Sequence, residues 1–212
     1  MEKNIKLAII GSGGFAREVY NLAKDINTNF PETFKTINFV ETDDFHKKNF
    51  VDGVKVFKLS ECDIKKTYFI FGIADPSKKL KILNELPSSI KFTSLISPTS
   101  VISNDFIHGV GLVVMPFSYI SCNVSFGAHV HINSHCTIGH DTKVGSFFTS
   151  ACSVMISGEN EISDLCYFGM NSTTKQGITI CKNTIIGLNS GVVKDIQKSG
   201  TYIGTPAKLL TK

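Results

Sequence analysis

Four of the six histidines in this sequence lie within twelve positions of one another, and the last of them is followed by an aspartate. They are His129, His131, His135 and His140, with Asp141 directly after. An imidazole beside a carboxylate is held in one tautomer and becomes more basic, which suits a general base near neutral pH. His140 and Asp141 are therefore predicted as a catalytic pair. The competing interpretation is an exposed histidine without a role, and most of the other histidines are expected at the surface.

A period of six residues organises the segment that carries this pair. From Ile96 to Val192, seventeen positions keep one phase, and all of them except His108, Ser150 and Thr174 are apolar. Helices repeat at 3.6 residues and strands at 2, so a period of six is typical of a hexapeptide β-helix. Three hexapeptides make one triangular coil, which predicts about five and a half coils with these residues pointing inward. A β-sandwich with loose alternation is the alternative, but it rarely keeps one phase for so long.

Glycine often follows an inward position. Six inward residues have this neighbour: Gly109, Gly127, Gly139, Gly145, Gly169 and Gly187. We expect these glycines to relieve corners at which the φ angle is unfavourable for residues with a Cβ.

The segment before the repeat predicts a small α/β domain, which we place at residues 1-88, with the β-helix and its C-terminal cap at residues 89-212. Residues 6–10 read as a buried strand, residues 11–14 as a glycine turn and residues 15–24 as an amphipathic helix. Such a unit is typical of a Rossmann-like phosphate site, because glycines let the backbone approach a phosphate at a helix N-terminus. A plain tight turn is the alternative. Further strands are expected at residues 37–40, 54–57 and 68–73, and a helix at residues 78–86.

Acidic residues follow the second expected strand, at Glu41, Asp43 and Asp44. In Rossmann-like domains an acidic residue at this place binds ribose hydroxyls, whereas a solvated acidic turn is the alternative. The domain is too small for a full dinucleotide fold, so we expect a mononucleotide-sized site and no NAD-dependent oxidoreductase.

Composition excludes several classes of partner. The net charge of +4 is mild and evenly spread, which argues against nucleic acid binding. No signal peptide or membrane span is expected, because the apolar run at residues 7–10 is too short for either. Six cysteines without a CxxC pair are expected to be reduced thiols, which fits a cytoplasmic protein.

Four motifs occur in the chain in a fixed order around the hexapeptide run. They are GSGGFAREV at residues 11–19, GIAD at residues 72–75, IGHD at residues 138–141 and YIGTPAK at residues 202–208. With these motifs the chain resembles the NeuD/PglD-type sugar O-/N-acyltransferases, hexapeptide-repeat proteins with a small Rossmann-like N-terminal domain and a left-handed parallel β-helix. The resemblance covers nearly the whole chain.

The resemblance implies a homotrimer that moves the acetyl group of acetyl-CoA to the amino group of a nucleotide-linked sugar for bacterial glycan biosynthesis, with no metal and with active sites between subunits. It implies that His140 is the general base and that Asp141 orients it. It implies that acetyl-CoA contacts Thr149, Gly158, Pro206, Ala207 and Lys208. It implies that the sugar nucleotide contacts Gly11, Ser12, Gly13, Gly14, Arg17, Glu41, Asp43, Asp44 and Asp75.

The sequence departs from the family pattern at three places, one of which is the spacing of the acidic residues Glu41, Asp43 and Asp44 after the second strand. Thr149 stands where many relatives carry a second histidine, nine residues after the base, and Ala74 stands where they carry glycine. Three alternatives stay open: O-acetylation of a sugar such as a sialic acid, a non-catalytic sugar-nucleotide-binding protein, and a zinc enzyme. The zinc site would use His135 and His140, which are five residues apart, with His129 or His131 as a third ligand.

Overall fold

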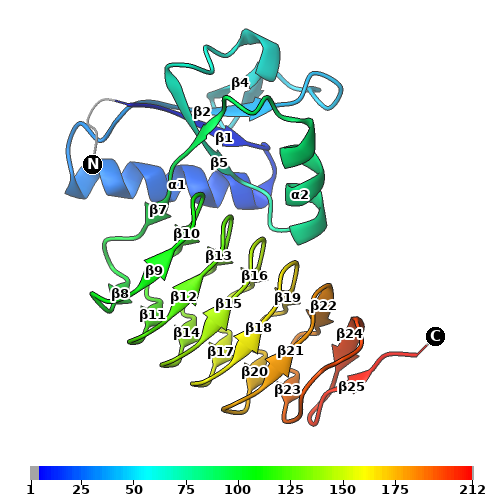
Figure 1. Cartoon of the computed structure of the whole chain (residues 1–212). Helices are drawn as coiled ribbons and strands as arrows, with labels where there is room; N and C mark the ends of the chain where they lie inside the picture. The colour runs from blue at the N-terminus through cyan, green and yellow to red at the C-terminus, as the bar shows by residue number, and fades with distance from the viewer. Residues whose placement is uncertain (1–4, 212) are drawn as a thin grey trace.

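The computed structural model describes residues 5–211 as a small α/β domain seated on one face of a three-sided parallel β-helix (Figure 1). The predicted fold class, an α/β domain followed by a left-handed β-helix, is confirmed. Residues 1–4, where no signal peptide is expected, lie outside the described residues. Within residues 5–211, no helix is both long enough and apolar enough to cross a membrane.

The N-terminal domain is built on one six-stranded sheet in the order β3-β4-β2-β1-β5-β6. The continuous apolar run of β1 lies at its centre, between the parallel neighbours β2 and β5, as expected for a strand covered on both faces. All of the expected strands are present, and two short ones are added. The strands are β1 (Ile5–Ile10), β2 (Phe34–Glu41), β3 (Phe50–Val51), β4 (Val54–Lys58), β5 (Thr67–Phe71) and β6 (Lys91–Phe92).

Two α-helices, α1 (Gly14–Asn29) and α2 (Pro76–Glu85), flank this sheet, and a 3₁₀ turn, η1 (Leu59–Glu61), follows β4. Helix α1 is longer than expected, and its buried stripe of small and branched residues packs against the sheet. Helix α2 begins two residues earlier than expected, because Pro76 occupies the first turn and the Asp75 carboxylate accepts a hydrogen bond from the Lys78 N–H at 3.0 Å.

The β-helix consists of three parallel sheets, one on each side of the coil. The first contains β7 (Leu95–Ile96), β10 (Val113–Val114), β13 (His131–Ile132), β16 (Thr149–Ser150), β19 (Tyr167–Phe168), β22 (Thr184–Ile186) and β24 (Gly200–Ile203), with the antiparallel β25 (Lys208–Leu209) at its end. The second contains β8 (Val101–Ile102), β11 (Tyr119–Ile120), β14 (Thr137–Ile138), β17 (Met155–Ile156), β20 (Thr173–Thr174) and β23 (Gly191–Val192). The third contains β9 (Ile107–His108), β12 (Ser125–Phe126), β15 (Lys143–Val144), β18 (Glu161–Ile162) and β21 (Thr179–Ile180).

The predicted inward positions form the core of the β-helix. From Val114 to Val192 every one of them is buried, including the polar Ser150 and Thr174. In the first coil, by contrast, His108 is exposed and Ile96 and Ile102 are only half-buried, because no coil lies beneath them.

The expected reason for the recurring glycines is wrong. None of the six has a positive φ; the left-handed corner residues lie two positions later and are mostly not glycine, as at His129, Asp141 and Asn171. Instead, a Cβ on Gly139 would meet the backbone of Gly158 in the next coil, with the Gly158 Cα at 2.8 Å. These glycines therefore allow successive coils to stack closely.

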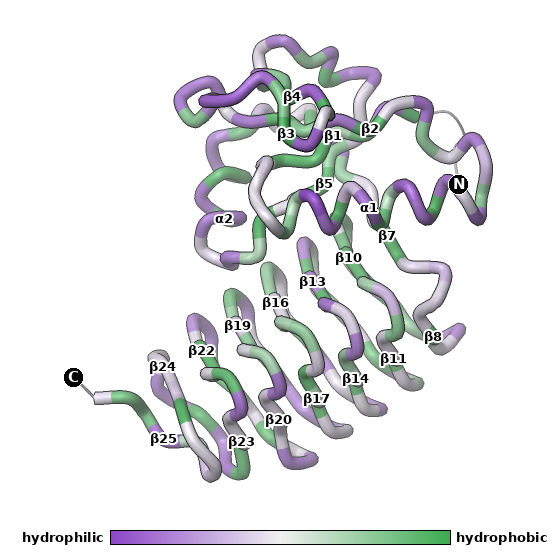
Figure 2. The backbone as a smooth tube through the Cα atoms, turned by 180° about the vertical axis from the view of Figure 1, so that it is seen from behind, coloured by the Kyte–Doolittle hydropathy of each residue, from purple (hydrophilic) through white to green (hydrophobic). Residues whose placement is uncertain are grey.

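The three outer faces of the β-helix differ in character. The covered face, on the sheet that begins with β7, lies under α1 and α2 in both views (Figures 1 and 2), and its outward residues Leu95, Val113, His131 and Thr149 are buried. The apolar face, on the sheet of β8, exposes Val101, Tyr119 and Met155. The polar face, on the sheet of β9, carries a Lys143–Glu161 ion pair at 3.3 Å.

Docking of the N-terminal domain overturns one expectation about the histidines. His129 and His131 were expected at the surface, but they are 3% and 0% exposed. The His129 ring packs among Phe71, Phe92 and Phe147. The six-residue period predicts the coil but not which outer face another domain covers.

Candidate active site

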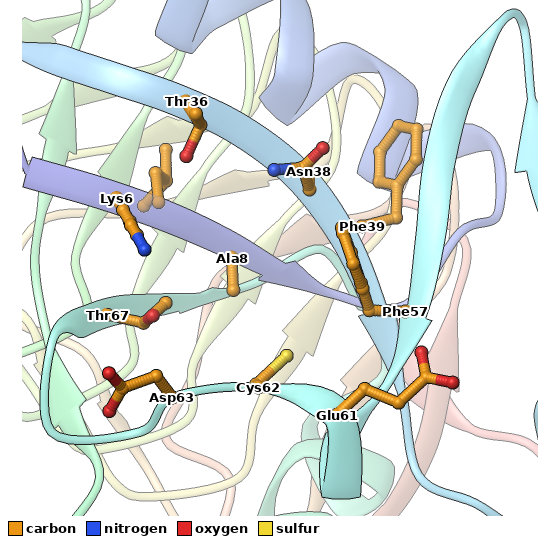
Figure 3. Close-up of a pocket in the computed structure, with 11 residues that line it drawn as sticks. Lys6, Ala8, Thr36, Asn38, Phe39, Phe57, Glu61, Cys62, Asp63 and Thr67 are labelled. Atoms are coloured by element: carbon orange, nitrogen blue, oxygen red, sulfur yellow. The ribbon is translucent and has the colours of Figure 1, made fainter.

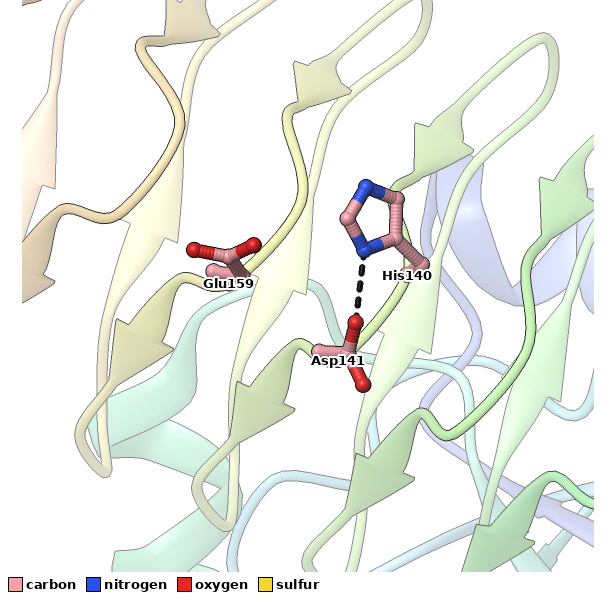
Figure 4. Close-up of side chains that lie close together, drawn as sticks. All are labelled: His140, Asp141 and Glu159. Carbon is pink, nitrogen blue, oxygen red and sulfur yellow. Dashed lines mark hydrogen bonds and ion pairs between the residues drawn. The ribbon is translucent and has the colours of Figure 1, made fainter.

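His140 and Asp141 form a hydrogen-bonded pair at the corner between β14 and β15 (Figure 4). The His140 Nδ1 lies 2.6 Å from the Asp141 Oδ2. Asp141 has a φ of 59°, a left-handed conformation that aspartate tolerates better than most residues, and it follows His140 directly. Since a carboxylate can only accept, Nδ1–H donates and Nε2 keeps its lone pair. The pair is half-exposed and therefore open to a substrate.

Asn123, one coil earlier, holds the carboxylate from the other side. Its Nδ2 donates to the Asp141 Oδ1 at 2.6 Å, and its own N–H donates to the Asp105 carboxylate at 2.9 Å. The hydrogen bond from Asn123, followed by that from His140, lowers the pKa of Asp141. Asp141 is therefore ionised at neutral pH. Sequence reasoning missed Asn123, although the 18-residue spacing of 105, 123, 141 and 159 could have found it.

Gly158 and Glu159 complete the corner from the next coil. The His140 ring lies on Gly158 so closely that a Cβ there would be 2.7 Å from Nε2. The Glu159 N–H donates to the His140 carbonyl at 2.7 Å, and the Gln176 amide donates to the Glu159 carboxylate at 3.0 Å. The structure thus brings the predicted Gly158 to the predicted base, and Glu159 is a neighbour that sequence reasoning missed.

By donor type alone, the side chains at this corner could bind a metal ion. The donor atoms of His140, Asp141 and Glu159 lie within 4.8 Å of one another, the one such group in the described part of the chain. However, the imidazole and the Asp141 carboxylate already satisfy each other at 2.6 Å. The three-histidine zinc site is not assembled within the chain, because His129 and His131 lie under the N-terminal domain.

The glycine turn after β1 lines two adjoining clefts of about 620 and 590 Å³. Both are bordered by Gly13, Gly14, Glu41 and Phe45. The Ser12 hydroxyl donates to the Glu41 carboxylate at 2.5 Å, which fixes the turn against the end of β2. No side chain caps helix α1, so its first N–H groups are free to bind an anion.

Cationic side chains surround these clefts. Lys78 and Lys81 of α2 border the larger cleft, whereas Arg17, Lys47 and Lys48 border the other. Arg17 also forms an exposed ion pair with Asp52 at 3.3 Å. Positive charge around a helix N-terminus suits a diphosphate group.

Three predicted acidic residues are not at the glycine turn. Asp43 and Asp44 border a separate hollow beside η1, and Asp43 accepts a hydrogen bond from the Ser60 N–H at 3.2 Å. Hydrogen bonds from Ser60 lower the pKa of Asp43. The Asp75 carboxylate caps α2. Of the acidic residues predicted to bind the sugar nucleotide, Glu41 is the one that borders the clefts.

The residues predicted to contact acetyl-CoA are spread along the β-helix. Thr149 is 2% exposed on the covered face, and its hydroxyl accepts a hydrogen bond from the Lys79 Nζ at 3.0 Å. Pro206, Ala207 and Lys208 belong to the hairpin that closes the last coil, where the Ala207 N–H donates to the Gly191 carbonyl at 2.8 Å. The structure therefore does not bring Thr149 to the same surface as His140.

A further pocket of about 300 Å³ lies on the sheet of the N-terminal domain (Figure 3). Lys6, Asn38, Asp63 and Thr67 project around it, and Cys62 lies beside it. None of the predicted site residues borders this pocket.

The chain is similar in sequence and in structure to known proteins. Residues 6–86 match the PglD N-terminal domain family. A GDP-perosamine N-acetyltransferase of Escherichia coli O157:H7 is 27% identical over 176 residues, which cover 80% of this chain and 78% of that protein.

Two solved structures match almost the full length. The acetyltransferase domain of PglB from Neisseria gonorrhoeae, in complex with acetyl coenzyme A, is 25% identical with a TM-score of 0.87 and covers 98% of this chain and 100% of its own. PerB from Caulobacter crescentus, in complex with CoA and GDP-perosamine, is 24% identical with a TM-score of 0.86 and 97% coverage of both chains. The similarity to PerB, at less than 25% identity, shows that the two chains share a fold.

Proposed function

Since the chain belongs to the NeuD/PglD-type sugar acyltransferases, we propose that it transfers the acetyl group of acetyl-CoA to the amino group of a nucleotide-linked sugar. The observation that carries this proposal is the His140–Asp141 pair, hydrogen-bonded at 2.6 Å on an open corner. Acetyl transfer to an amine needs one base, an aligned thioester and no metal.

The reaction follows from this pair. The His140 Nε2 removes a proton from the sugar amine while the nitrogen attacks the thioester carbonyl carbon. The resulting oxyanion collapses, the C–S bond breaks, and the departing sulfur of CoA takes the proton back from the imidazolium. The Asp141 carboxylate stabilises the imidazolium that forms in between.

The neighbours of the base support two further roles. Gly158 presents backbone rather than a side chain to the imidazole, which leaves room for the thioester beside Nε2. Glu159 adds a second negative charge close to the base, which attracts an amine in its protonated form. The amine then loses that proton to solvent and attacks in its neutral form.

We place the nucleotide part of the substrate in the clefts beside the glycine turn. The uncapped α1 N-terminus, Arg17 and the four lysines suit a diphosphate, and Glu41 suits ribose hydroxyls. Because the Escherichia coli relative is a GDP-perosamine N-acetyltransferase and PerB was solved with GDP-perosamine, a GDP-linked amino sugar is the first candidate. The setting we propose is cytoplasmic synthesis of an acetylated sugar for a bacterial glycan.

We also propose that three copies assemble through the apolar face. Val101, Tyr119 and Met155 are 63%, 47% and 56% exposed there, and stacked apolar residues on a β-helix favour burial against a second copy. His140 follows β14, at the edge of this face, so a neighbour would form the second wall of its site.

The test is release of free CoA thiol with acetyl-CoA and a panel of acceptors. The panel holds GDP-perosamine, UDP- and dTDP-linked amino sugars, CMP-sialic acid and free sialic acid. Rapid release with an amino sugar, lost in H140N, is the expected result. Release with sialic acid alone would replace the proposal by O-acetylation. Binding of a nucleotide sugar without any turnover would favour the non-catalytic alternative.

A further inference from the structure

Lys79 is a fully buried lysine between the two domains, and acetyl transfer as described above does not use it. It projects from α2, has no exposed side-chain area and reaches the β-helix. Its Nζ lies 2.7 Å from the His129 carbonyl, 3.3 Å from the Phe148 carbonyl and 3.0 Å from the Thr149 hydroxyl. These three acceptors come from two successive coils.

The number of acceptors matches the chemistry of an ammonium group. A lysine ammonium has three donors and no acceptor, so each donor is paired here. Burial, with the Asp75 charge opposing it, lowers the pKa of Lys79, and burial also lowers the pKa of His129 and His131 beside it. A buried polar group in this position is stable only while its hydrogen bonds are made, which makes the docked geometry specific.

Helix α2 connects this contact to the nucleotide clefts. Lys78, Lys81, Ile82 and Glu85 of the same helix border the larger cleft, while Lys79 points the other way, to the β-helix. One helix therefore forms both a wall of the cleft and the polar contact with the catalytic domain. Any rotation or shift of α2 would move that wall.

We propose that Lys79 is a positioning residue, which fixes α2 on the β-helix and thereby sets the shape of the sugar-nucleotide cleft. Thr149 is its partner, and the Thr149 hydroxyl serves domain docking rather than contact with acetyl-CoA. The inference rests on the proposed function for the identity of the ligand in the cleft.

The experiment compares Lys79→Met, Thr149→Val and Thr149→Ser with the wild-type protein. KM values for GDP-perosamine and for acetyl-CoA are measured separately, and GDP and CoA binding are measured by calorimetry. We expect K79M to raise the KM for the sugar nucleotide and the Kd for GDP by about tenfold or more, because the loss of three hydrogen bonds to the β-helix would let α2 and the wall of the cleft shift. The KM for acetyl-CoA and the Kd for CoA should change less than about twofold. T149V should show a smaller shift in the same direction, and T149S should behave as wild type.

Hydrogen exchange of α2 provides a readout that does not depend on turnover. The amides of residues 76–85 should exchange faster in K79M, whereas the matched variant Lys35→Met, at an exposed lysine on β2, should leave them unchanged. If no acceptor is turned over, the proposed function fails, while exchange and GDP binding still decide the role of Lys79. A T149V variant that raises only the KM for acetyl-CoA would overturn the inference. So would a K79M variant that melts earlier with unchanged affinity for GDP and the sugar nucleotide.

Discussion

At the scale of the residue, the proposed chemistry rests on the corner that places an aspartate beside a histidine. The left-handed conformation of Asp141 turns its carboxylate toward the His140 Nδ1, and the Asn123 amide holds it there. Because these hydrogen bonds lower the pKa of Asp141, the carboxylate is charged at the pH at which an amine is acetylated. The imidazole therefore keeps the lone pair of Nε2 for the proposed role as base.

Replacing His140 tests this role. H140A should lower kcat by roughly 10²–10⁴, since a general base contributes about that much. The unfolding midpoint should stay close to wild type, because the side chain is half-exposed on the coil surface. Near-normal turnover in this variant would remove His140 from its proposed role.

At the scale of the element, the repeat explains what could be predicted from the sequence and what could not. The six-residue phase predicts the core from Val114 to Val192, because each inward residue must stack on its equivalent in the next coil. It also places His140 and Gly158 near each other, on adjacent coils.

The six-residue period does not predict the contacts between the N-terminal domain and the β-helix. Lys79 is one of three lysines in four positions of α2, and sequence alone does not show that it is the one that becomes buried. The burial of His129 and His131 depends on how the N-terminal domain docks. Such docking is decided by the shape of two surfaces, and the spacing of residues along the chain does not encode it.

Two glycines, one coil apart, make a matched test of the stacked coils. A Cβ at Gly158 would meet the mobile end of the His140 side chain, whereas a Cβ at Gly139 would meet backbone of the next coil. We expect Gly158→Ala to displace the imidazole and lower kcat at least tenfold with little change in the unfolding midpoint. Gly139→Ala should destabilise the fold by about 1–3 kcal/mol, as overpacking does. Thermal denaturation and thiol release distinguish the two; equal stability of both variants would contradict the stacking model.

At the scale of the whole molecule, the three outer faces have separate uses. The covered face holds the N-terminal domain, the polar face carries the Lys143–Glu161 ion pair, and the apolar face lacks an intramolecular cover at Val101, Tyr119 and Met155. Because His140 lies beside the apolar face, the proposed assembly would also complete the proposed active site.

Domain docking should make stability depend on pH. Burial lowers the pKa of His129 from 6.5 to about 4, so the unfolded chain binds a proton more readily than the folded chain between these values. Stability should therefore be complete above about pH 6.5 and decrease as the pH falls toward 4, by up to about 3 kcal/mol for this group. His129→Asn, which tolerates the φ of 58°, should flatten the dependence of the melting temperature on pH in this window. Identical slopes for variant and wild type would exclude His129 as the cause.

Assembly through the apolar face predicts a second difference between variants. Tyr119→Lys should shift the protein from trimer to monomer in sedimentation and reduce turnover, since a charge on this face cannot be buried without a partner. Thr179→Lys, on the polar face, should do neither. A wild-type protein that sediments as a monomer would rule out the shared site.

Because successive coils rise by the same distance, the β-helix fixes the distance between residues on different coils. Strands β14, β17, β20 and β23 are consecutive neighbours, and rungs about 4.8 Å apart put the coil of Gly191 roughly 14 Å beyond that of His140. The Ala207 N–H donates a hydrogen bond to the Gly191 carbonyl, so the acetyl-CoA contact expected at Ala207 and the proposed acetyl-transfer corner are separated by a fixed number of coils. An acyl donor shorter than CoA would not reach both points. Duplication of one 18-residue coil between them would increase the distance between the two points by one coil, so CoA would no longer reach both.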